Sequence, residues 1–238
     1  MKAAQSLESQ PIEGILLVDK AKGRTSFSLV HLLRKRLGVK KIGHAGTLDP
    51  FATGVMVLLI GRNFTRLSDQ FLCNDKEYEA EVYLGASTDT FDSEGKISSQ
   101  SSEVPSLESI MKALENFQGE VEQIPPMFSA KKKQGKKLYE LARKGLEVER
   151  EPVKIQLQTH FISYSYPFLR LRIACSKGTY IRSIAHDLGG MLGCGAHLTN
   201  LRRTRSGIFT LEQCISDDEL ASPAFDLIGR LLPAQGAC

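Results

Sequence analysis

Residues 44–50, HAGTLDP, bring a histidine, a hydroxyl side chain and a carboxylate together within one short stretch. Residues 55–60, which follow closely, form an uninterrupted apolar run of the kind found in strands buried on both faces. A loop next to such a strand can hold a carboxylate rigidly. Asp49 is therefore a candidate for nucleophilic or acid–base chemistry.

Asp49 also has a purely structural interpretation. An aspartate followed by a proline is a favourable helix start, with Asp49 as the cap and Pro50 in the first turn. That interpretation leaves the nearby glycines unexplained, whereas glycines at this density let the backbone approach a ligand closely. On this motif alone both interpretations stay open.

Several familiar catalytic motifs are absent from the sequence. It contains no G-x-x-x-x-G-K-[ST] loop, no strand-linked G-x-G-x-x-G turn and no G-x-S-x-G nucleophile motif. The five histidines lack the spacing of metal ligands, and the five cysteines form neither a C-x-x-C pair nor a disulfide framework. We therefore expect no metal and no cofactor. The cysteines, the lack of a secretory signal and the lack of a bilayer-length apolar run favour a cytoplasmic protein without membrane attachment.

Basic residues are clustered, although the net charge is only +4. One cluster places five lysines in residues 130–137, a second covers residues 34–36 and 40–41, and a third covers residues 202–205. A single basic run is usually a solvated surface. Three runs beside the informative motifs favour binding of a polyanion, RNA or DNA.

Hydrophobic periodicity predicts alternating strands and helices without a strict strand–helix–strand rhythm. Strands are expected at residues 14–19, 55–60, 77–84, 153–157, 168–175 and 198–210, and helices at residues 26–37, 107–117, 138–144 and 180–191. Residues 40–54 are expected to be irregular. The helix near residue 110 is expected to bury Leu107, Ile110, Met111 and Leu114. We infer an α+β fold around a mixed, mainly antiparallel sheet flanked by helices, with residues 124–152 as a basic insertion.

Several sequence blocks, taken in order, resemble the TruB family of tRNA pseudouridine synthases. Residues 43–55 resemble the catalytic motif of that family. The other blocks are residues 14–26, 76–80 with 88–92, 123–139, and 175–182 with 201–203. The similarity extends from about residue 14 to residue 209, and agreement of this many blocks in order is very unlikely to arise by chance.

The resemblance implies the pseudouridine synthase fold and isomerisation of the uridine at position 55 in the T loop of tRNA. It implies that Asp49 is the catalytic aspartate, that Arg182 pairs with it, and that Tyr78 stacks on the target base. Tyr180 and Leu201 are expected to bind the base, and His44 to fill the space that the nucleotide leaves. The insertion is expected to be mobile and to close over the RNA. Backbone contacts to RNA are expected from Lys20, Lys131, Lys132, Lys133, Lys136 and Arg202.

Elementary electrostatics supports pairing Asp49 with an arginine. A free aspartate, with a pKa of about 3.9, is ionised at neutral pH. Burial in a dry pocket raises that pKa, and a neighbouring guanidinium opposes the shift. We therefore expect Arg182 to keep the carboxylate charged.

The ends of the chain and three departures from the family pattern bear on the prediction. We expect an N-terminal extension at residues 1–13, a catalytic domain at 14–215 and a short tail at 216–238 in place of the RNA-binding module of many relatives. Ala21 replaces a usual proline, and residues 61–66 follow their block only loosely. We expect a monomer that needs no protein partner. A non-catalytic RNA-binding protein and a synthase for another RNA are the alternatives.

Overall fold

A computed structural model describes residues 11–72 and 75–233. Residues 1–10, most of the expected N-terminal extension, and residues 234–238 of the expected tail lie outside the described residues. A nine-stranded sheet organises the molecule, with the main strand order β1-β3-β12-β4-β11-β10-β7. Its strands are β1 (Gly14–Lys20), β2 (Ile42–His44), β3 (Thr53–Ile60), β4 (Lys76–Leu84), β7 (Gln118–Gln123), β10 (Val153–Ser165), β11 (Phe168–Cys175), β12 (Ala196–Ser206) and β13 (Phe209–Thr210).

Helices and two small strand pairs complete the described structure. The α-helices are α1 (Ser26–Leu37), α2 (Arg62–Thr65), α3 (Ser68–Leu72), α4 (Leu107–Leu114), α5 (Leu138–Ala142), α6 (Ile181–Met191) and α7 (Asp217–Ala221). Short 3-10 turns are η1 (Glu115–Phe117), η2 (Leu211–Gln213) and η3 (Ile228–Arg230). The strand pairs are β5 (Ala86–Thr88) with β6 (Ile97–Gln100), and β8 (Lys132–Lys133) with β9 (Lys136–Lys137).

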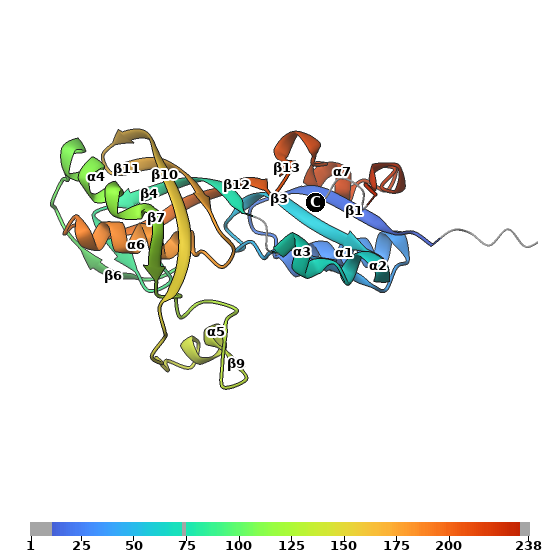
Figure 1. Ribbon diagram of the computed structural model, residues 1–238, viewed down its shortest axis with the longest axis horizontal. Coiled ribbons are helices and arrows are strands. Elements are labelled where there is room, and N and C mark those ends of the chain that lie inside the picture. The colour runs from blue at the N-terminus through green and yellow to red at the C-terminus, as the bar shows by residue number, and fades with distance from the viewer. Residues whose placement is uncertain (1–10, 73–74, 234–238) are drawn as a thin grey trace, which may run out of the picture.

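The molecule is elongated, with β12 lying between its two ends (Figure 1). β4, β10 and β11 with α4 and α6 form one end, and β1 and β3 with α1, α2 and α3 form the other. Strand pairing is antiparallel except at the junction of β12 with β3, where Arg202 faces Thr53 and Arg203 faces Gly54 in parallel register. The expected α+β fold with a mixed, mainly antiparallel sheet is confirmed.

The apolar run in β3 is explained by cover on both faces of the sheet. Met56 and Leu58 belong to the larger core, together with Leu29 and Leu33 of α1. The alternate residues of β3, such as Val57, belong to a second core. Since neither face meets water, every position from Val55 to Ile60 is apolar. The carboxylate loop is thus attached to one of the most buried elements of the protein.

α1 covers the range that the sequence predicts, residues 26–37, and local signals set both of its ends. The Thr25 hydroxyl accepts a hydrogen bond from the Ser28 amide at 3.0 Å, which caps the first turn. Gly38 ends the helix in the left-handed region, at φ 69°. In β4 the alternation of buried and half-buried residues confirms the predicted period of two.

The helix near residue 110 differs from the prediction. It ends at Leu114, and η1 follows it. Ile110 and Leu114 are buried as expected, whereas Leu107 and Met111 are 49% and 46% exposed. The buried face includes Ala113 in place of these two residues, so the helix covers the core with only a narrow stripe.

Two strands of the nine-stranded sheet, β2 and β7, fall where the sequence did not predict them. β2 lies within residues 40–54 and pairs with β3, so that segment is only partly irregular. β7 extends the sheet by pairing with β10. Its sequence, QGEVEQ, is almost entirely polar, and all its residues but the last are at least partly exposed. An exposed edge strand of this kind carries no hydrophobic signal.

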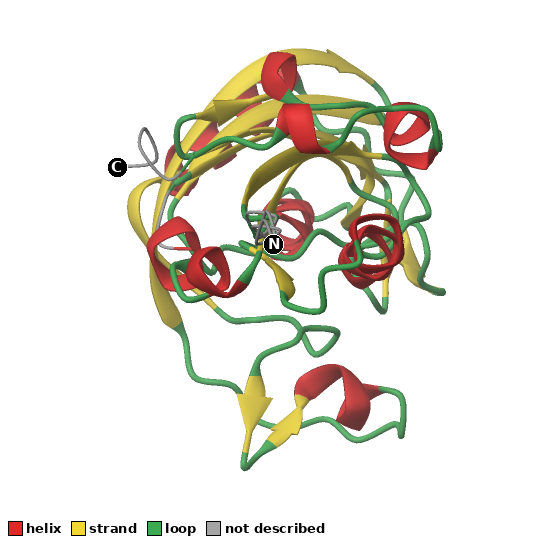
Figure 2. Ribbon diagram, turned by 90° about the vertical axis from the view of Figure 1, so that its right-hand side faces the viewer, coloured by secondary structure: helices red, strands yellow, loops and turns green. Residues whose placement is uncertain are grey.

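The insertion and the C-terminal segment have different environments. The insertion contains the β8–β9 hairpin and α5, and it projects away from the sheet (Figure 2). Residues 216–233 pack onto the core, where Leu220 and Leu227 are buried. Leu232 forms an antiparallel bridge with Ile15 of β1, and the Arg36 guanidinium donates to the Leu220 carbonyl at 2.7 Å.

Candidate active site

A cavity of about 810 Å³ is lined by residues from both ends of the molecule. Its walls come from the loop 46–50, the turn 90–94, the insertion, and the segment that leads into α6. Five of the residues expected at the site line it: Asp49, Tyr78, Tyr180, Arg182 and Leu201. Segments from distant regions of the chain therefore converge on one space.

The carboxylate of Asp49 and the guanidinium of Arg182 form an ion pair inside this cavity. The Arg182 Nε donates to Asp49 Oδ2 at 2.9 Å, and Nη2 lies 3.4 Å from Oδ1. Arg182 is almost fully buried, at 5% side-chain exposure, whereas 36% of the Asp49 side chain is accessible. The carboxylate is thus the member of the pair that a bound molecule can reach.

Hydrogen bonds from Ser26 and within the loop itself fix the loop that carries Asp49. The Ser26 hydroxyl, at the start of α1, donates to the Leu48 carbonyl at 3.1 Å and accepts from the Leu48 amide at 2.9 Å. The Asp49 carbonyl accepts from the Ala52 amide, which closes a turn. No helix begins at Asp49 or Pro50, both of which are described, so the helix-cap interpretation is wrong.

Lys20, the last residue of β1, also fixes this loop. Its side chain is fully buried, and Nζ donates to the carbonyls of Arg24 at 2.7 Å, Ala21 at 3.1 Å and Pro50 at 3.2 Å. Burial lowers the pKa of Lys20 to about 8. The expectation that Lys20 contacts the RNA backbone does not fit a side chain with no accessible surface.

Burial and charge act in opposite directions on Asp49. Burial raises the pKa of its carboxyl above the usual value. The accessible part of the side chain faces the cavity, where surrounding protein atoms still keep most water away. The neighbouring Asp92 carboxylate raises this pKa as well, whereas Arg182 and Lys20 lower it. Arg182 therefore favours the ionised carboxylate as expected, but burial outweighs it.

Three further groups hold the guanidinium of Arg182. Its Nη1 donates to the Thr90 carbonyl at 2.9 Å and lies 3.5 Å from Asp92 Oδ2, and its Nη2 donates to the Phe128 carbonyl at 2.8 Å. Asp92 is itself buried. The sequence pattern predicts no role for Asp92, although this residue lies in one of the family-like blocks.

Tyr78 and Leu201 form the sheet wall of the cavity. Tyr78 lies on β4 and Leu201 on the neighbouring strand β12, and both are largely buried. Burial raises the pKa of the Tyr78 phenol, so the ring is neutral at ordinary pH. A neutral aromatic ring beside a carboxylate can accommodate a flat, uncharged base.

Tyr180 is positioned by a side-chain amide from β7. The buried Gln123 accepts from the Tyr180 amide at 2.8 Å through Oε1 and donates to the Tyr180 carbonyl at 3.0 Å through Nε2. Tyr180 is the N-cap residue directly before α6, and Arg182 lies in the first turn of that helix. The unpredicted strand β7 thus sets the entry of the helix that carries Arg182.

Two family models match consecutive parts of the chain. Residues 34–181 match the N-terminal domain model described as TruB family pseudouridylate synthase. The chain belongs to the TruB family. Residues 182–226 match a second model, the tRNA pseudouridylate synthase B C-terminal domain. The boundary between the two matches falls inside α6, and the sheet continues across it because β12 pairs with β3 and β4.

Curated relatives of this TruB-family chain share most of its length. A protein named tRNA pseudouridine synthase B from Protochlamydia amoebophila is 68% identical over 91% of this chain and 83% of its own length. A protein of the same name from Chlamydia muridarum is 59% identical over 97% of this chain and 95% of its own length.

Solved structures resemble the whole described fold. A chain in a Cbf5–Nop10–Gar1 complex is 28% identical with a TM-score of 0.71, covering 92% of this chain and 60% of its own. A chain in an H/ACA RNP bound to a substrate RNA containing 2′-deoxyuridine is 26% identical with a TM-score of 0.67, covering 92% and 58%. The TruB-family chain thus spans less than two thirds of either solved chain.

His44 is the expected site residue that the structure places apart from the others. It ends β2 and is half-buried, but it is not among the residues that line the cavity. Burial lowers the pKa of its imidazole, and the nearby Arg203 lowers it further. His44 lies next to the loop 46–50, and its expected role in filling the space that the nucleotide leaves stays a prediction.

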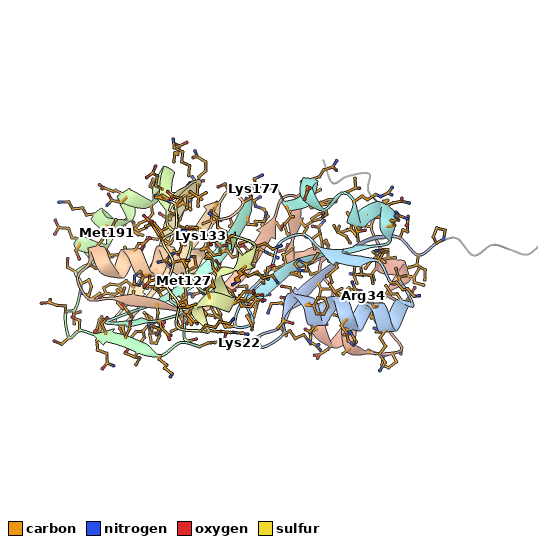
Figure 3. All side chains as sticks on the ribbon, turned by 90° about the horizontal axis from the view of Figure 1, so that it is seen from below. Lys22, Arg34, Met127, Lys133, Lys177 and Met191 are labelled. Atoms are coloured by element: carbon orange, nitrogen blue, oxygen red, sulfur yellow. The ribbon has the colours of Figure 1, made fainter. Side chains whose placement is uncertain are left out.

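The basic clusters of this TruB-family chain divide into exposed and internally paired groups. Lys131, Lys132 and Lys136 are exposed on the insertion, and the half-buried Lys133 donates through Nζ to the Glu149 carbonyl. Figure 3 shows Lys22, Lys133 and Lys177 near the middle of the face from which the insertion projects. Lys177 also lines the cavity, so cations are present at the cavity as well as on the insertion.

The three arginines of the third basic cluster make contacts within the protein, and their expected role in binding a polyanion stays a prediction. Arg202 donates to both carboxylate oxygens of Asp19, at 2.7 and 3.2 Å, and Arg205 pairs with Asp75 at 2.8 Å. Arg203 is 1% exposed and donates to the Val55 carbonyl at 2.7 Å. These arginines hold β12 against its neighbours.

None of the helices in residues 11–72 and 75–233 is long and apolar enough to span a membrane. The same residues contain no group of three or more His, Cys, Asp or Glu side chains that could hold a metal ion.

Proposed function

We propose that this protein isomerises uridine to pseudouridine at position 55 in the T loop of tRNA and that Asp49 acts on the bound nucleotide. The observation that carries the proposal is the Asp49–Arg182 pair, in which the carboxylate faces a cavity and the guanidinium is buried behind it. Membership of the TruB family and the names of the curated relatives support the reaction and the tRNA substrate.

The reaction itself requires little from the protein beyond a positioned carboxylate. The bond from the ribose to N1 of uracil breaks, the base turns, and a bond to C5 forms. The C5 proton is lost and N1 regains a proton, so product and substrate have the same composition. No electron acceptor and no energy donor is needed. Attack on the sugar, attack on the ring and elimination at the sugar are all open to Asp49, and each uses an ionised carboxylate.

Binding of the base is assigned to the walls of the cavity. Extruding a nucleotide from its stack costs a few kcal/mol. Stacking on the ring of Tyr78 returns about 1–3 kcal/mol of this cost, because base–aromatic contacts have that magnitude in other proteins. Leu201 and Tyr180 complete the apolar part of the pocket.

Binding of the tRNA backbone is assigned to the exposed lysines of the insertion. Lys131, Lys132 and Lys136 lie next to cavity-lining residues of the same segment, such as Phe128 and Tyr139. Contacts of ammonium groups with phosphates release counterions and make affinity depend on salt. We propose that the protein acts in the cytoplasm as a monomer on the T arm, without a cofactor or an obligate protein partner.

The proposal is tested with unmodified tRNA transcripts. The protein is incubated with a transcript, and pseudouridine is mapped by chemical adduct formation and primer extension. The expected result is a single product at the T-loop uridine, absent when that uridine is replaced by cytidine and absent with the Asp49→Asn variant. Product at another uridine would overturn the substrate assignment, and product with Asp49→Asn would overturn the role of Asp49.

A further inference from the structure

The ring of Phe91 stacks on the imidazole of His186. The two ring centroids are 3.8 Å apart and the planes are inclined by only 13°. Phe91 belongs to the turn that follows β5, and His186 lies in α6. Neither residue is among those that line the cavity, so the stack lies behind the site.

The turn that carries Phe91 is the one that holds Arg182. Thr90, the residue before Phe91, supplies the carbonyl that accepts from Arg182 Nη1 at 2.9 Å. Asp92, the residue after it, places a carboxylate oxygen 3.5 Å from the same nitrogen. Any movement of Phe91 therefore changes both contacts at once.

The backbone of this turn is held in an unfavourable conformation. Phe91 has φ 65°, in the left-handed region that side chains other than glycine rarely adopt. A surrounding structure must maintain such a conformation. The Phe91 carbonyl accepts from the Leu198 amide at 3.0 Å, and the Asp92 carboxylate accepts from the Thr90 hydroxyl at 2.6 Å. These hydrogen bonds hold the backbone and the Asp92 side chain of the turn, and the stack with His186 holds the ring of Phe91.

α6 contacts the turn 90–92 through two of its side chains. Arg182 and His186 are four residues apart in one helix, so their side chains project from the same face. The guanidinium binds the backbone of the turn, and the imidazole packs on the ring of the same turn. The helix and the turn are thus joined at two points, one of which is the Asp49 partner itself.

We propose that His186 is a positioning residue for this site: by stacking on Phe91 it fixes the turn 90–92, which in turn fixes Arg182 against Asp49. The inference rests on the proposed function of Asp49. His186 acts through the face of its ring and not through its charge. Burial lowers the pKa of this imidazole, which favours the neutral form, and its Nδ1 is buried without a hydrogen-bond partner.

The test compares two variants of His186 with a control on the same helix. His186→Ala removes the stack, and His186→Phe keeps an aromatic face without an ionisable group. Met191→Ala changes a residue that is 57% exposed near the end of α6 and serves as the control. Each variant is measured for kcat and KM on tRNA, and for the Asp49 carboxyl pKa by NMR in the protein without RNA.

The expected result is a fall in kcat of about threefold to tenfold for His186→Ala, the size of one lost aromatic contact, with KM changed less than about twofold. The Asp49 pKa is expected to rise, because Arg182, which lowers it, moves away from the carboxylate. Burial and Asp92 continue to raise this pKa, and Lys20 continues to lower it. His186→Phe and Met191→Ala are expected to match the wild type in both measurements. Wild-type kcat and Asp49 pKa in His186→Ala would overturn the proposal.

Phe91→Gly provides an independent arm that also covers a failure of His186→Ala to fold. Glycine removes the ring but accepts the left-handed conformation without strain, so folding is favoured while the stack is lost. The same fall in kcat and rise in Asp49 pKa are expected, and their absence would overturn the proposal. Because the pKa is measured without RNA, it tests the positioning of Arg182 even if the wild type modifies no tRNA.

Discussion

The Arg182 guanidinium contacts both oxygens of the Asp49 carboxylate across 133 residues of sequence. Asp49 comes from the loop before β3, and Arg182 comes from the first turn of α6, at the junction of the two family matches. The cavity exists because β12 brings these two regions of the sheet together.

Replacing Arg182 with lysine is expected to move the acid limb of the activity profile to higher pH. Lysine can neither reach both carboxylate oxygens nor bind the Thr90 and Phe128 carbonyls together. The charge of Arg182 and its hydrogen bond to the carboxylate both lower the Asp49 pKa. Lysine keeps a charge but loses the guanidinium hydrogen bonds that place it, so the Asp49 pKa rises further and activity that needs the carboxylate is lost at a higher pH as the solution is acidified. Single-turnover rates measured as a function of pH should show the acid limb at a higher pH in Arg182→Lys than in the wild type. An acid limb that stays in place in Arg182→Lys would contradict this assignment.

Tyr78 is expected to act through its ring face. Tyr78→Phe retains the face and should keep kcat/KM within about tenfold of the wild type, whereas Tyr78→Leu should lose about 10-fold to 100-fold. Equal activity in the phenylalanine and leucine variants would exclude stacking.

The exposed lysines of the insertion should determine the salt dependence of tRNA binding. Replacing Lys131 and Lys132 with alanine together should reduce the slope of log K against log salt by about 2. Arg202→Ala should reduce it by less, since Arg202 is engaged by Asp19. Lys112→Ala changes an exposed lysine on α4, away from the insertion (Figure 1), and is the matched control. A slope unchanged in the double variant would remove the insertion from the RNA interface.

Gly54 permits the parallel junction between β3 and β12. A methyl group there would lie 2.2 Å from the Arg203 carbonyl oxygen, and φ is 106°. Gly54→Ala should therefore lower the free energy of unfolding by at least about 2 kcal/mol in urea. Gly190→Ala, in α6 with no atom within 4 Å, should instead raise it by about 0.5–1 kcal/mol. Equal stability of Gly54→Ala and the wild type would contradict the close approach of the two strands.

The elements of the fold with strong periodic patterns could be predicted from the sequence. The cap and the terminal glycine of α1, the alternation in β4 and the apolar run of β3 all have local causes. β7 could not be predicted, because five of its six residues are polar or glycine and its only specification is its pairing with β10. Periodicity wrongly places Leu107 and Met111 in the core, because it does not show where the covered face of a helix ends.

The site was only partly predictable, because its contacts join residues that lie far apart in the chain. The residues at the cavity were suggested by family resemblance, which carries information about distant contacts that spacing lacks. Arg203 and Lys20 could not be distinguished from solvated surface charges, because their partners are backbone carbonyls. Asp92 lacked a signal of its own, since its function depends on a guanidinium far along the chain, that of Arg182.

The most direct test of the account is single-turnover conversion of the T-loop uridine by the wild type and by Asp49→Asn, with tRNA affinity measured in parallel. Asparagine has nearly the same shape as aspartate but neither the charge nor the nucleophilicity. The predicted result is affinity within about threefold of the wild type and a rate lower by at least about a thousandfold, as befits a group that acts on the reacting atoms. An Asp49→Asn protein that forms pseudouridine within about tenfold of the wild-type rate would contradict the central claim.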